Sequence, residues 1–209
     1  MGISKNDRGD FMEIEKIFGN LPTLETERLL LRKITLEDAW DMHYYGSNEN
    51  VSKFVTWETH KSLSDTREFI EFVLSKYENK KIAPWGIEYK ENGKLIGTID
   101  FVSWQLKHNI AEIGYVLSQD YWGKGITTEA AKEVIKFGFE NMDLVRIQAR
   151  CDIENIGSAR VMEKVGMTFE GVIRKGIFVK SKHRDIKMYS IINEELSTIP
   201  NPKIENVNR

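Results

Sequence analysis

Residues Gln119–Glu129 read Gln-Asp-Tyr-Trp-Gly-Lys-Gly-Ile-Thr-Thr-Glu and join a strand-like run, residues 110–117, to a long amphipathic segment. Gly123 and Gly125 lack a Cβ atom, so the backbone can come close to a ligand here. We expect a helix to begin around Lys124, and a helix start offers unpaired N–H groups and a positive dipole end to an anion. The stretch therefore predicts a phosphate-binding turn. It lacks the third glycine of a dinucleotide fingerprint, so these residues alone leave the ligand open.

The segments on either side of this turn indicate where it lies in the fold. Residues 110–117 and 145–152 are strand-like and flank the amphipathic helix, so we expect parallel neighbours joined by a right-handed crossover. A ligand at the turn would then lie at the carboxyl ends of these strands, where open sheets usually bind.

The rest of the chain alternates between helical and strand-like periods. After a strand at residues 29–34, Thr35 and Asp38 form a predicted capping box. A second helix is expected to begin near Ser64 or Asp65, with Glu68 as the N3 partner of Asp65, and to end around residue 79. The further expected elements are antiparallel strands at 84–89 and 94–104 around the turn Asn92-Gly93, a helix at 156–165 ended by Gly166, and a hairpin of 168–179 with 185–192.

This order predicts an α+β, or mixed α/β, fold with one mostly antiparallel sheet, one parallel strand pair at the ligand site and helices on both faces. We expect residues 1–23 to be an N-terminal extension outside the core, residues 24–193 to form the domain, and residues 194–209 to be a flexible tail.

Composition excludes several classes of protein. Charged residues make up 30% of the 209 residues and the net charge is −2, which disfavours direct nucleic-acid binding. No apolar run reaches the length of a membrane span, and the first residues lack the apolar core of a secretory signal. The single cysteine, Cys151, fits a reducing cytoplasm. The four histidines and Cys151 stand at no metal-ligand spacing, so we expect no metal site.

Several short motifs follow one another along the chain. They are Leu24–Arg32, Leu95-Ile96-Gly97, Ala111–Leu117, Tyr121–Gly125, Glu129-Ala130, Asn155-x-x-Ser158, Glu163–Met167 and Glu170-Gly171. In this order they resemble the GNAT superfamily of acetyl-CoA-dependent N-acetyltransferases, and within it the RimJ/RimL type, the ribosomal-protein N-terminal acetyltransferases and their relatives. The resemblance spans residues 24–192. It implies an acyl-CoA N-acyltransferase fold, acetyl-CoA as co-substrate and a primary amine as acceptor.

The resemblance also implies which residues contact the coenzyme. Amides from Gly123 to Thr128 would hold its pyrophosphate, and pantetheine would pair with the strand like an added strand. The implied cofactor-binding residues are Tyr115, Val116, Leu117, Trp122, Gly123, Lys124, Gly125, Ile126, Thr127, Thr128, Asn155 and Ser158. Thr127 departs from the glycine or alanine of the family pattern. Its hydroxyl would either add a donor to the phosphate or hinder the close approach.

Two residues are candidates for the chemistry. An amine must lose a proton before it attacks a thioester, and Glu112 matches the family's strand glutamate, as the base or as an orienting group. Its alternative is a solvated strand residue. Where many relatives carry a tyrosine that protonates the leaving thiolate, Met162 stands here, and the resemblance transfers that role to Ser158. The alternative for Ser158 is a serine that only satisfies backbone groups at a helix start. We interpret Tyr115 as a core or wall residue.

The sequence leaves the acceptor open. The resemblance favours a protein N-terminal amine of the ribosomal-protein type. Its rivals are a small-molecule amine, such as an aminoglycoside, polyamine or amino acid, and a non-catalytic acyl-CoA-binding module. The region Val51–Ser64 carries no motif that decides between them, although the resemblance implies that residues around Phe54–Trp57 line the acceptor pocket. The chain is expected to act as a monomer or homodimer.

Overall fold

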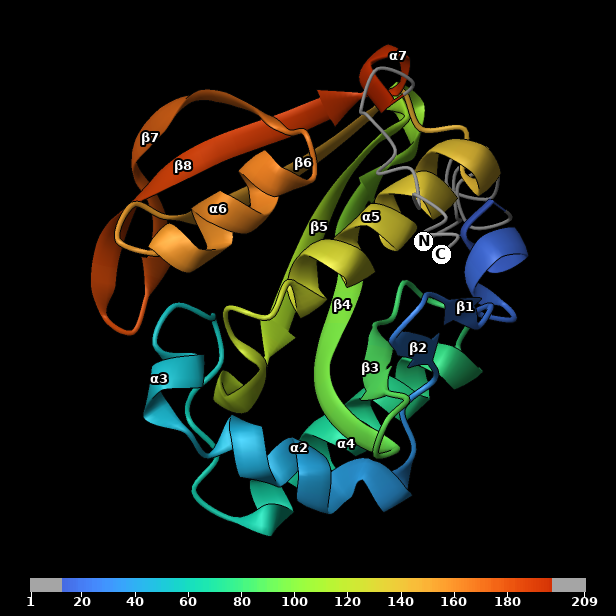
Figure 1. Ribbon diagram of the computed structural model, residues 1–209, viewed down its shortest axis with the longest axis vertical. Coiled ribbons are helices and arrows are strands. Elements are labelled where there is room, and N and C mark those ends of the chain that lie inside the picture. The colour runs from blue at the N-terminus through green and yellow to red at the C-terminus, as the bar shows by residue number, and fades with distance from the viewer. Residues whose placement is uncertain (1–12, 197–209) are drawn as a thin grey trace, which may run out of the picture.

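The computed structural model describes residues 13–196 of the chain and contains an eight-stranded sheet in the order β1-β2-β3-β4-β5-β6-β8-β7 (Figure 1). Its strands are β1 (Leu24–Glu25), β2 (Leu29–Arg32), β3 (Trp85–Tyr89), β4 (Lys94–Gln105), β5 (Ile110–Leu117), β6 (Arg146–Asp152), β7 (Thr168–Val179) and β8 (Lys182–Ile192). Every neighbouring pair is antiparallel except β5 and β6, which are parallel. The predicted fold class is confirmed.

Helices cover both faces of this sheet. They are α2 (Ala39–Gly46), α3 (Glu49–Ser52), α4 (Leu63–Glu78), α5 (Ile126–Asn141), α6 (Ile156–Lys164) and α7 (Asn193–Leu196), with 3-10 turns at Leu36–Asp38, Leu106–His108 and Gln119–Tyr121. Helices α5 and α6 lie in front of the sheet in Figure 1. We call that side the front face and the opposite side, where α2 and α4 pack, the rear face.

Alternation along β4 and β5 sends side chains to these two faces in turn. Gly138 of α5 comes so close to the front face that a Cβ there would lie 3.0 Å from the Phe101 ring. On the rear face, Thr98 and Val116 line a small cavity together with residues of α2 and α4. Because Phe101 and Thr98 lie three residues apart on one strand, the sheet separates two packed layers.

The parallel pair opens into a fork. Strands β5 and β6 are paired only at their beginning, and the last paired residues are Glu112 and Gln148. Beyond this point the two strands diverge (Figure 1), so the second half of β5 has unpaired backbone groups on the β6 side. An unpaired strand edge is able to accept an extended ligand as an added strand.

The N-terminal segment corrects one expectation. Residues 13–18 are helical, and the Phe18 side chain is only 1% exposed. Its ring centroid lies 6.3 Å from that of Trp85 and 6.5 Å from that of Trp104. The expectation that this segment lies outside the core is therefore wrong for residues 13–23, because Phe18 and Leu21 are buried. Residues 1–12 lie outside the described part of the chain.

Element boundaries shift by a few residues from those expected. The capping box of α4 is formed by Ser62 and Asp65, since Ser62 accepts a hydrogen bond from the Asp65 amide at 3.3 Å; the start expected at Ser64 or Asp65, with Glu68 as partner, is wrong. Helix α5 begins at Ile126 rather than around Lys124. The box at Thr35 and Asp38 is confirmed. Of the expected tail, the structure describes only the start, where Asn193–Leu196 is helical.

Candidate functional site

A cavity of about 900 Å³ occupies the fork between β5 and β6 and extends to the first turns of α5 and α6. It brings together most residues that the sequence predicted for the coenzyme, namely Tyr115, Val116, Leu117, Trp122, Gly123, Gly125, Ile126, Thr127, Thr128, Asn155 and Ser158. Two predicted residues, Lys124 and Glu112, are not among those that line it. Residues 40 positions apart thus meet at the carboxyl ends of the two strands, as expected.

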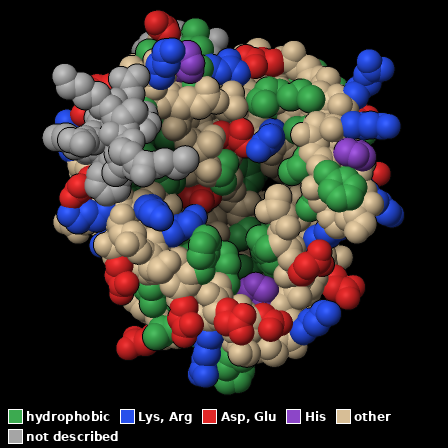
Figure 2. Space-filling view, turned by 180° about the vertical axis from the view of Figure 1, so that it is seen from behind, with side chains coloured by type: hydrophobic (Ala, Val, Ile, Leu, Met, Phe, Trp, Pro, Cys, Tyr) green, Lys and Arg blue, Asp and Glu red, His purple; other side chains and the backbone are tan. Residues whose placement is uncertain are grey.

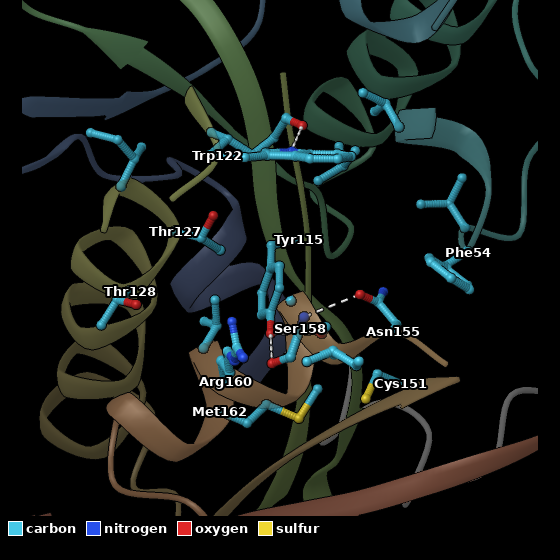
Figure 3. Close-up of a pocket in the computed structure, with 18 of the residues that line it drawn as sticks. Phe54, Tyr115, Trp122, Thr127, Thr128, Cys151, Asn155, Ser158, Arg160 and Met162 are labelled. Carbon is cyan, nitrogen blue, oxygen red and sulfur yellow. Dashed lines mark hydrogen bonds between the residues drawn. The ribbon is translucent and has the colours of Figure 1, made fainter. Parts of the chain in front are cut away.

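The glycine turn exposes backbone donors to the cavity. Gly123 has φ 73° and Gly125 has φ 76°, a left-handed conformation that favours glycine. The first bond within α5 runs from the Glu129 amide to the Gly125 carbonyl at 3.0 Å, so the amides of residues 126–128 precede the helical ladder. Thr127 and Thr128 line the cavity beside them (Figure 3). The turn therefore combines amide donors and hydroxyls in the arrangement that binds anions at helix starts.

A salt bridge from the beginning of the domain holds this turn in place. Glu129 accepts hydrogen bonds from the Thr26 hydroxyl at 2.6 Å and from the Arg28 amide at 2.9 Å, and it pairs with the Arg28 guanidinium at 2.6 Å. Arg28 also donates to the Lys124 carbonyl at 3.0 Å. Burial opposes ionisation of Glu129, but the bonds from Thr26 and Arg28 outweigh it and lower its pKa. Thr26 and Arg28 thus hold the glycine turn in position through Glu129 and the Lys124 carbonyl.

Trp122 closes one end of the cavity. Its indole Nε1–H donates to the Leu117 carbonyl at 2.8 Å, which places the ring over the end of β5 (Figure 3). The side chain remains 47% exposed although it is large and apolar. An exposed aromatic plane beside unpaired amides is suited to contact a ligand.

Tyr115 and Ser158 meet inside the cavity. Their hydroxyl groups are 2.9 Å apart, and the Tyr115 hydroxyl also lies 3.2 Å from the Ser158 carbonyl (Figure 3). Asn155 caps α6 by accepting a hydrogen bond from the Ser158 amide at 3.1 Å. Burial raises the pKa of Tyr115 far above its ordinary value, so its hydroxyl keeps its proton. Our interpretation of Tyr115 as a wall residue did not include this hydroxyl pair. The two residues lie 43 positions apart in the sequence, so no local pattern joins them.

Two sulfur-containing side chains lie beside this pair. Cys151 and Met162 both line the cavity and are 6% and 1% exposed. Burial raises the pKa of the Cys151 thiol, which keeps it protonated and a poor nucleophile. Met162 has no proton to donate, so hydroxyl chemistry at this end of the cavity rests on Ser158 and Tyr115.

Glu112 lies at the point where the fork begins. Its carboxylate pairs with the Arg150 Nε atom at 2.7 Å and accepts a hydrogen bond from Gln148 at 3.1 Å, and the residue is 6% exposed. Both partners come from β6, so Glu112 joins the two strands where their backbone pairing stops. Its predicted catalytic role stays a prediction, and the alternative of a solvated strand residue is wrong because the side chain is buried.

Sequence reasoning missed a set of basic side chains around the cavity. The cations that line it are Lys53, Arg150, Arg160 and Lys164, against one acid, Glu154. This excess of positive charge fits a ligand with several phosphates, such as coenzyme A. The spacing of Arg160 and Lys164, four residues apart on α6, was the available signal, since it places both on one helix face.

The region expected near the acceptor borders the same cavity. Val51, Phe54 and Val55 line it from the side of α3, and Phe54 lies across from Asn155 in Figure 3. The Lys180 ammonium, from the turn between β7 and β8, donates to the Ser52 carbonyl at 2.6 Å. Figure 2 shows that the rear face is hollowed at its centre, where apolar, acidic and basic side chains gather.

Among residues 13–196 there is no group of three or more His, Cys, Asp or Glu side chains that could hold a metal ion. The helices described here include none with the length and apolar character of a membrane span.

Comparisons with known proteins agree with this geometry. The family model "Acetyltransferase (GNAT) domain" matches residues 28–168. The chain is 35% identical over 171 residues to "Uncharacterized N-acetyltransferase YoaA" of Bacillus subtilis (strain 168), a match that covers 82% of this chain and 97% of the relative. It is 28% identical over 151 residues to "Putative ribosomal N-acetyltransferase YdaF" of the same strain, covering 71% of this chain and 81% of the relative.

Among solved structures, a GNAT-family acetyltransferase from Bacillus anthracis superposes with a TM-score of 0.74. It is 35% identical, and the match covers 83% of this chain and 100% of that chain. The similarity therefore extends over nearly all of the described sheet and its helices.

Proposed function

The chain belongs to the GNAT acetyltransferase family and is an acetyl-CoA-dependent N-acetyltransferase, and from this premise we propose that its acceptor is a protein N-terminal amine of the ribosomal-protein type. The observation that carries the proposal is the fork between β5 and β6. Its cavity runs from the glycine turn to residues 50–55, and the rear face is hollowed at its centre (Figure 2). An extended chain end has room to approach from that side. The relative named as a ribosomal N-acetyltransferase supports the same acceptor class.

The residues around the cavity divide into binding roles. The amides of residues 123–128 bind the pyrophosphate at the start of α5, with Thr127 and Thr128 as additional donors. Arg160 and Lys164 neutralise further phosphate charge. The unpaired edge of β5, Tyr115 to Leu117, binds the extended pantetheine arm through backbone hydrogen bonds.

Acetyl-CoA supplies an acetyl thioester, and transfer needs a neutral amine, an oriented carbonyl and a proton for the departing sulfur. The hydroxyl pair of Ser158 and Tyr115 provides that proton, because both groups are protonated and lie 2.9 Å apart inside the cavity. Asn155 fixes the start of α6 and with it the position of Ser158. No residue needs to carry the acetyl group, since the amine attacks it directly.

Glu112 has an orienting role in this proposal. Its ion pair with Arg150 ties β5 to β6 at the base of the fork and sets the distance between the strands. Replacement by glutamine keeps the shape and the hydrogen bond from Gln148 but removes the charge that holds Arg150.

The test is acetyl transfer measured by mass spectrometry on a panel of acceptors. We expect the mass of one acetyl group to appear on the α-amine of peptides with ribosomal-protein N termini, and coenzyme A to be released in equal amount. Peptides blocked at the N terminus but containing lysine serve as the matched control. Transfer restricted to aminoglycosides, polyamines or amino acids would contradict the protein acceptor. Coenzyme binding without transfer to any amine would contradict catalysis.

A further inference from the structure

Asp100 is a half-buried carboxylate on the rear face of β4, and none of the roles above uses it. Its neighbours Ile99 and Phe101 are fully buried on the front face, so the Asp100 side chain points the other way. The cross-strand partner of Asp100 is Gly114, and a Cβ built on that glycine would lie 2.7 Å from the Val102 Cγ1 atom and 3.5 Å from the Asp100 Oδ1 atom. Gly114 also lines the coenzyme cavity. Asp100 is therefore separated from the cavity by a residue without a side chain.

Strand alternation sets this position. The register of β4 against β5 is regular from Gly97 to Phe101 and places Asp100 opposite Gly114. A β-bulge follows between Phe101 and Ser103, and after it Ser103 stands opposite Glu112. Glu112 and Gly114 lie two residues apart on β5 and therefore share the rear face.

The surroundings of Asp100 leave its carboxylate free to bind a ligand. No hydrogen bond or ion pair joins it to another residue of the described chain, and Lys76 of α4 biases its charge without pairing with it. Burial raises the pKa of Asp100 to about 6, partly offset by Lys76. Titratable groups on this side include Tyr77 of α4, which interacts with Asp100 through space, and Glu112 with its partner Arg150. Tyr45 and His60 line the rear cavity together with Thr98 and Val116.

Glu112, unlike Asp100, has hydrogen-bond and ion-pair partners. One of its oxygens pairs with Arg150 at 2.7 Å and the other accepts a hydrogen bond from Gln148 at 3.1 Å. Both oxygens of Glu112 are therefore occupied by partners from β6. Of the two carboxylates near Gly114, Asp100 is the one without a partner among the described residues.

We propose that Asp100 binds the acceptor amine as an ammonium ion and takes its proton, with the amine entering from the rear face over Gly114. This inference rests on the proposed acetyl transfer and narrows the acceptor to a primary amine that is cationic when it arrives. In this arrangement Glu112 joins β5 to β6 through Arg150, and Asp100 contacts the acceptor amine.

A proton moves from the ammonium nitrogen to the Asp100 carboxylate, and the freed lone pair forms the nitrogen–carbon bond to the acetyl group while the carbon–sulfur bond breaks. The departing sulfur takes a proton from the Ser158 hydroxyl pair. That pair recovers a proton from the amide nitrogen, which loses its second proton on acylation. Asp100 releases its proton to water, so one proton is released per turnover.

The test compares Asp100→Asn with Glu88→Gln in the full-length protein. Glu88 is the matched control because it lies on the adjacent strand β3 and its carboxylate is already paired with Arg32. We expect Asp100→Asn to lower kcat/KM for the amine by about 100-fold. The affinity for coenzyme A stays unchanged, and Glu88→Gln keeps wild-type turnover.

Two pH series separate a proton acceptor from a structural residue. In the wild type, kcat/KM rises through the pKa of Asp100, about 6. In Asp100→Asn it rises only through the pKa of the amine itself, about 8 for a protein N terminus. Because the folded pKa of Asp100 lies above its ordinary 3.8, its ionisation destabilises the fold as pH rises from 3.8 to about 6. The Tm of Asp100→Asn relative to the wild type should therefore increase over that range.

Each alternative result has a distinct meaning. Wild-type kcat/KM in Asp100→Asn, measured while the wild type is active, overturns this inference and leaves the proposed function standing. Loss of coenzyme affinity together with a lower Tm in Asp100→Asn assigns the residue a structural role and also overturns it. Coenzyme binding by the wild type without transfer to any amine overturns the proposed function and this inference with it.

Discussion

Replacing Gly123 by alanine separates the conformational cost of the glycine turn from its contact with the coenzyme. Gly123 has φ 73°, and a Cβ built there has no atom within 4 Å. The methyl group therefore meets only open space in the free protein. In the complex it points into the region where the amides of residues 123–128 are proposed to hold the pyrophosphate, so it would push the phosphate away from its donors.

The structure also provides a control with the same conformational cost. Gly93, in the turn between β3 and β4, has φ 69° and likewise nothing within 4 Å of an added Cβ. A left-handed conformation costs an alanine about 1–2 kcal/mol. For a chain of this size we expect both Gly123→Ala and Gly93→Ala to lower Tm by about 2–8 °C.

Only Gly123→Ala should affect the ligand. Loss of one hydrogen bond to a charged phosphate costs about 1.5–3 kcal/mol, which corresponds to about 10- to 150-fold weaker binding. Isothermal titration with coenzyme A measures this directly, and unfolding by heat gives the stability of both variants. Equal affinities for coenzyme A in Gly123→Ala and Gly93→Ala would refute the placement of the pyrophosphate at this turn.

Three further changes test the supports of the site. Glu129→Gln should weaken coenzyme binding by about 10-fold, because it removes the ion pair with Arg28 that holds the glycine turn. The pKa of Glu129 is lowered from 4.5, so its ionised form stabilises the fold above pH 4.5 and this stabilisation is lost as pH falls below it. The free energies of unfolding of variant and wild type, measured in urea, should therefore converge in acid. Ser158→Ala and Tyr115→Phe should each lower kcat by about 10- to 100-fold with acetyl-CoA affinity unchanged, and thiol release by the double variant should show non-additive losses. The buried Tyr77 hydroxyl accepts a hydrogen bond from the Ile34 amide at 3.1 Å and donates one to the Pro84 carbonyl at 2.5 Å. Tyr77→Phe leaves both groups unpaired and should lower the free energy of unfolding, measured in urea, by about 1–3 kcal/mol.

Local patterns predicted much of this fold because the signals lie within single segments. Period-2 and helical periods located the strands and helices that flank the glycine turn, and Gly166, with φ 89°, ends α6 as expected. The residues of the turn itself were predictable for the same reason, since two glycines before a helix start are a local signal for an anion-binding turn.

Contacts between distant segments were not predictable in this way. The Arg28–Glu129 pair joins positions 101 residues apart, and nothing in either segment identifies the partner. Phe18 reads as part of a short polar-flanked piece, yet it packs against two tryptophans of the core. Both the Arg28–Glu129 pair and the burial of Phe18 depend on tertiary packing.

The chemistry near Glu112 shows the same limit. The sequence places an acid on a strand of apolar residues, but it does not reveal that Arg150 pairs with that acid or that Asp100 stands opposite Gly114. Both facts depend on the register between strands, and a shift by one residue would reverse which face each side chain occupies.

In the proposed reaction, the fork between β5 and β6 holds acetyl-CoA while an amine attacks from the other side. The most direct measurement is the product of one reaction, in which purified protein is incubated with acetyl-CoA and a peptide bearing a free N terminus, and peptide and coenzyme are quantified by mass spectrometry. We expect one acetyl group on the α-amine for each coenzyme A released, with both reduced together in Ser158→Ala. Coenzyme A released without acetylated amine, or acetylation unaffected by Ser158→Ala, would contradict it.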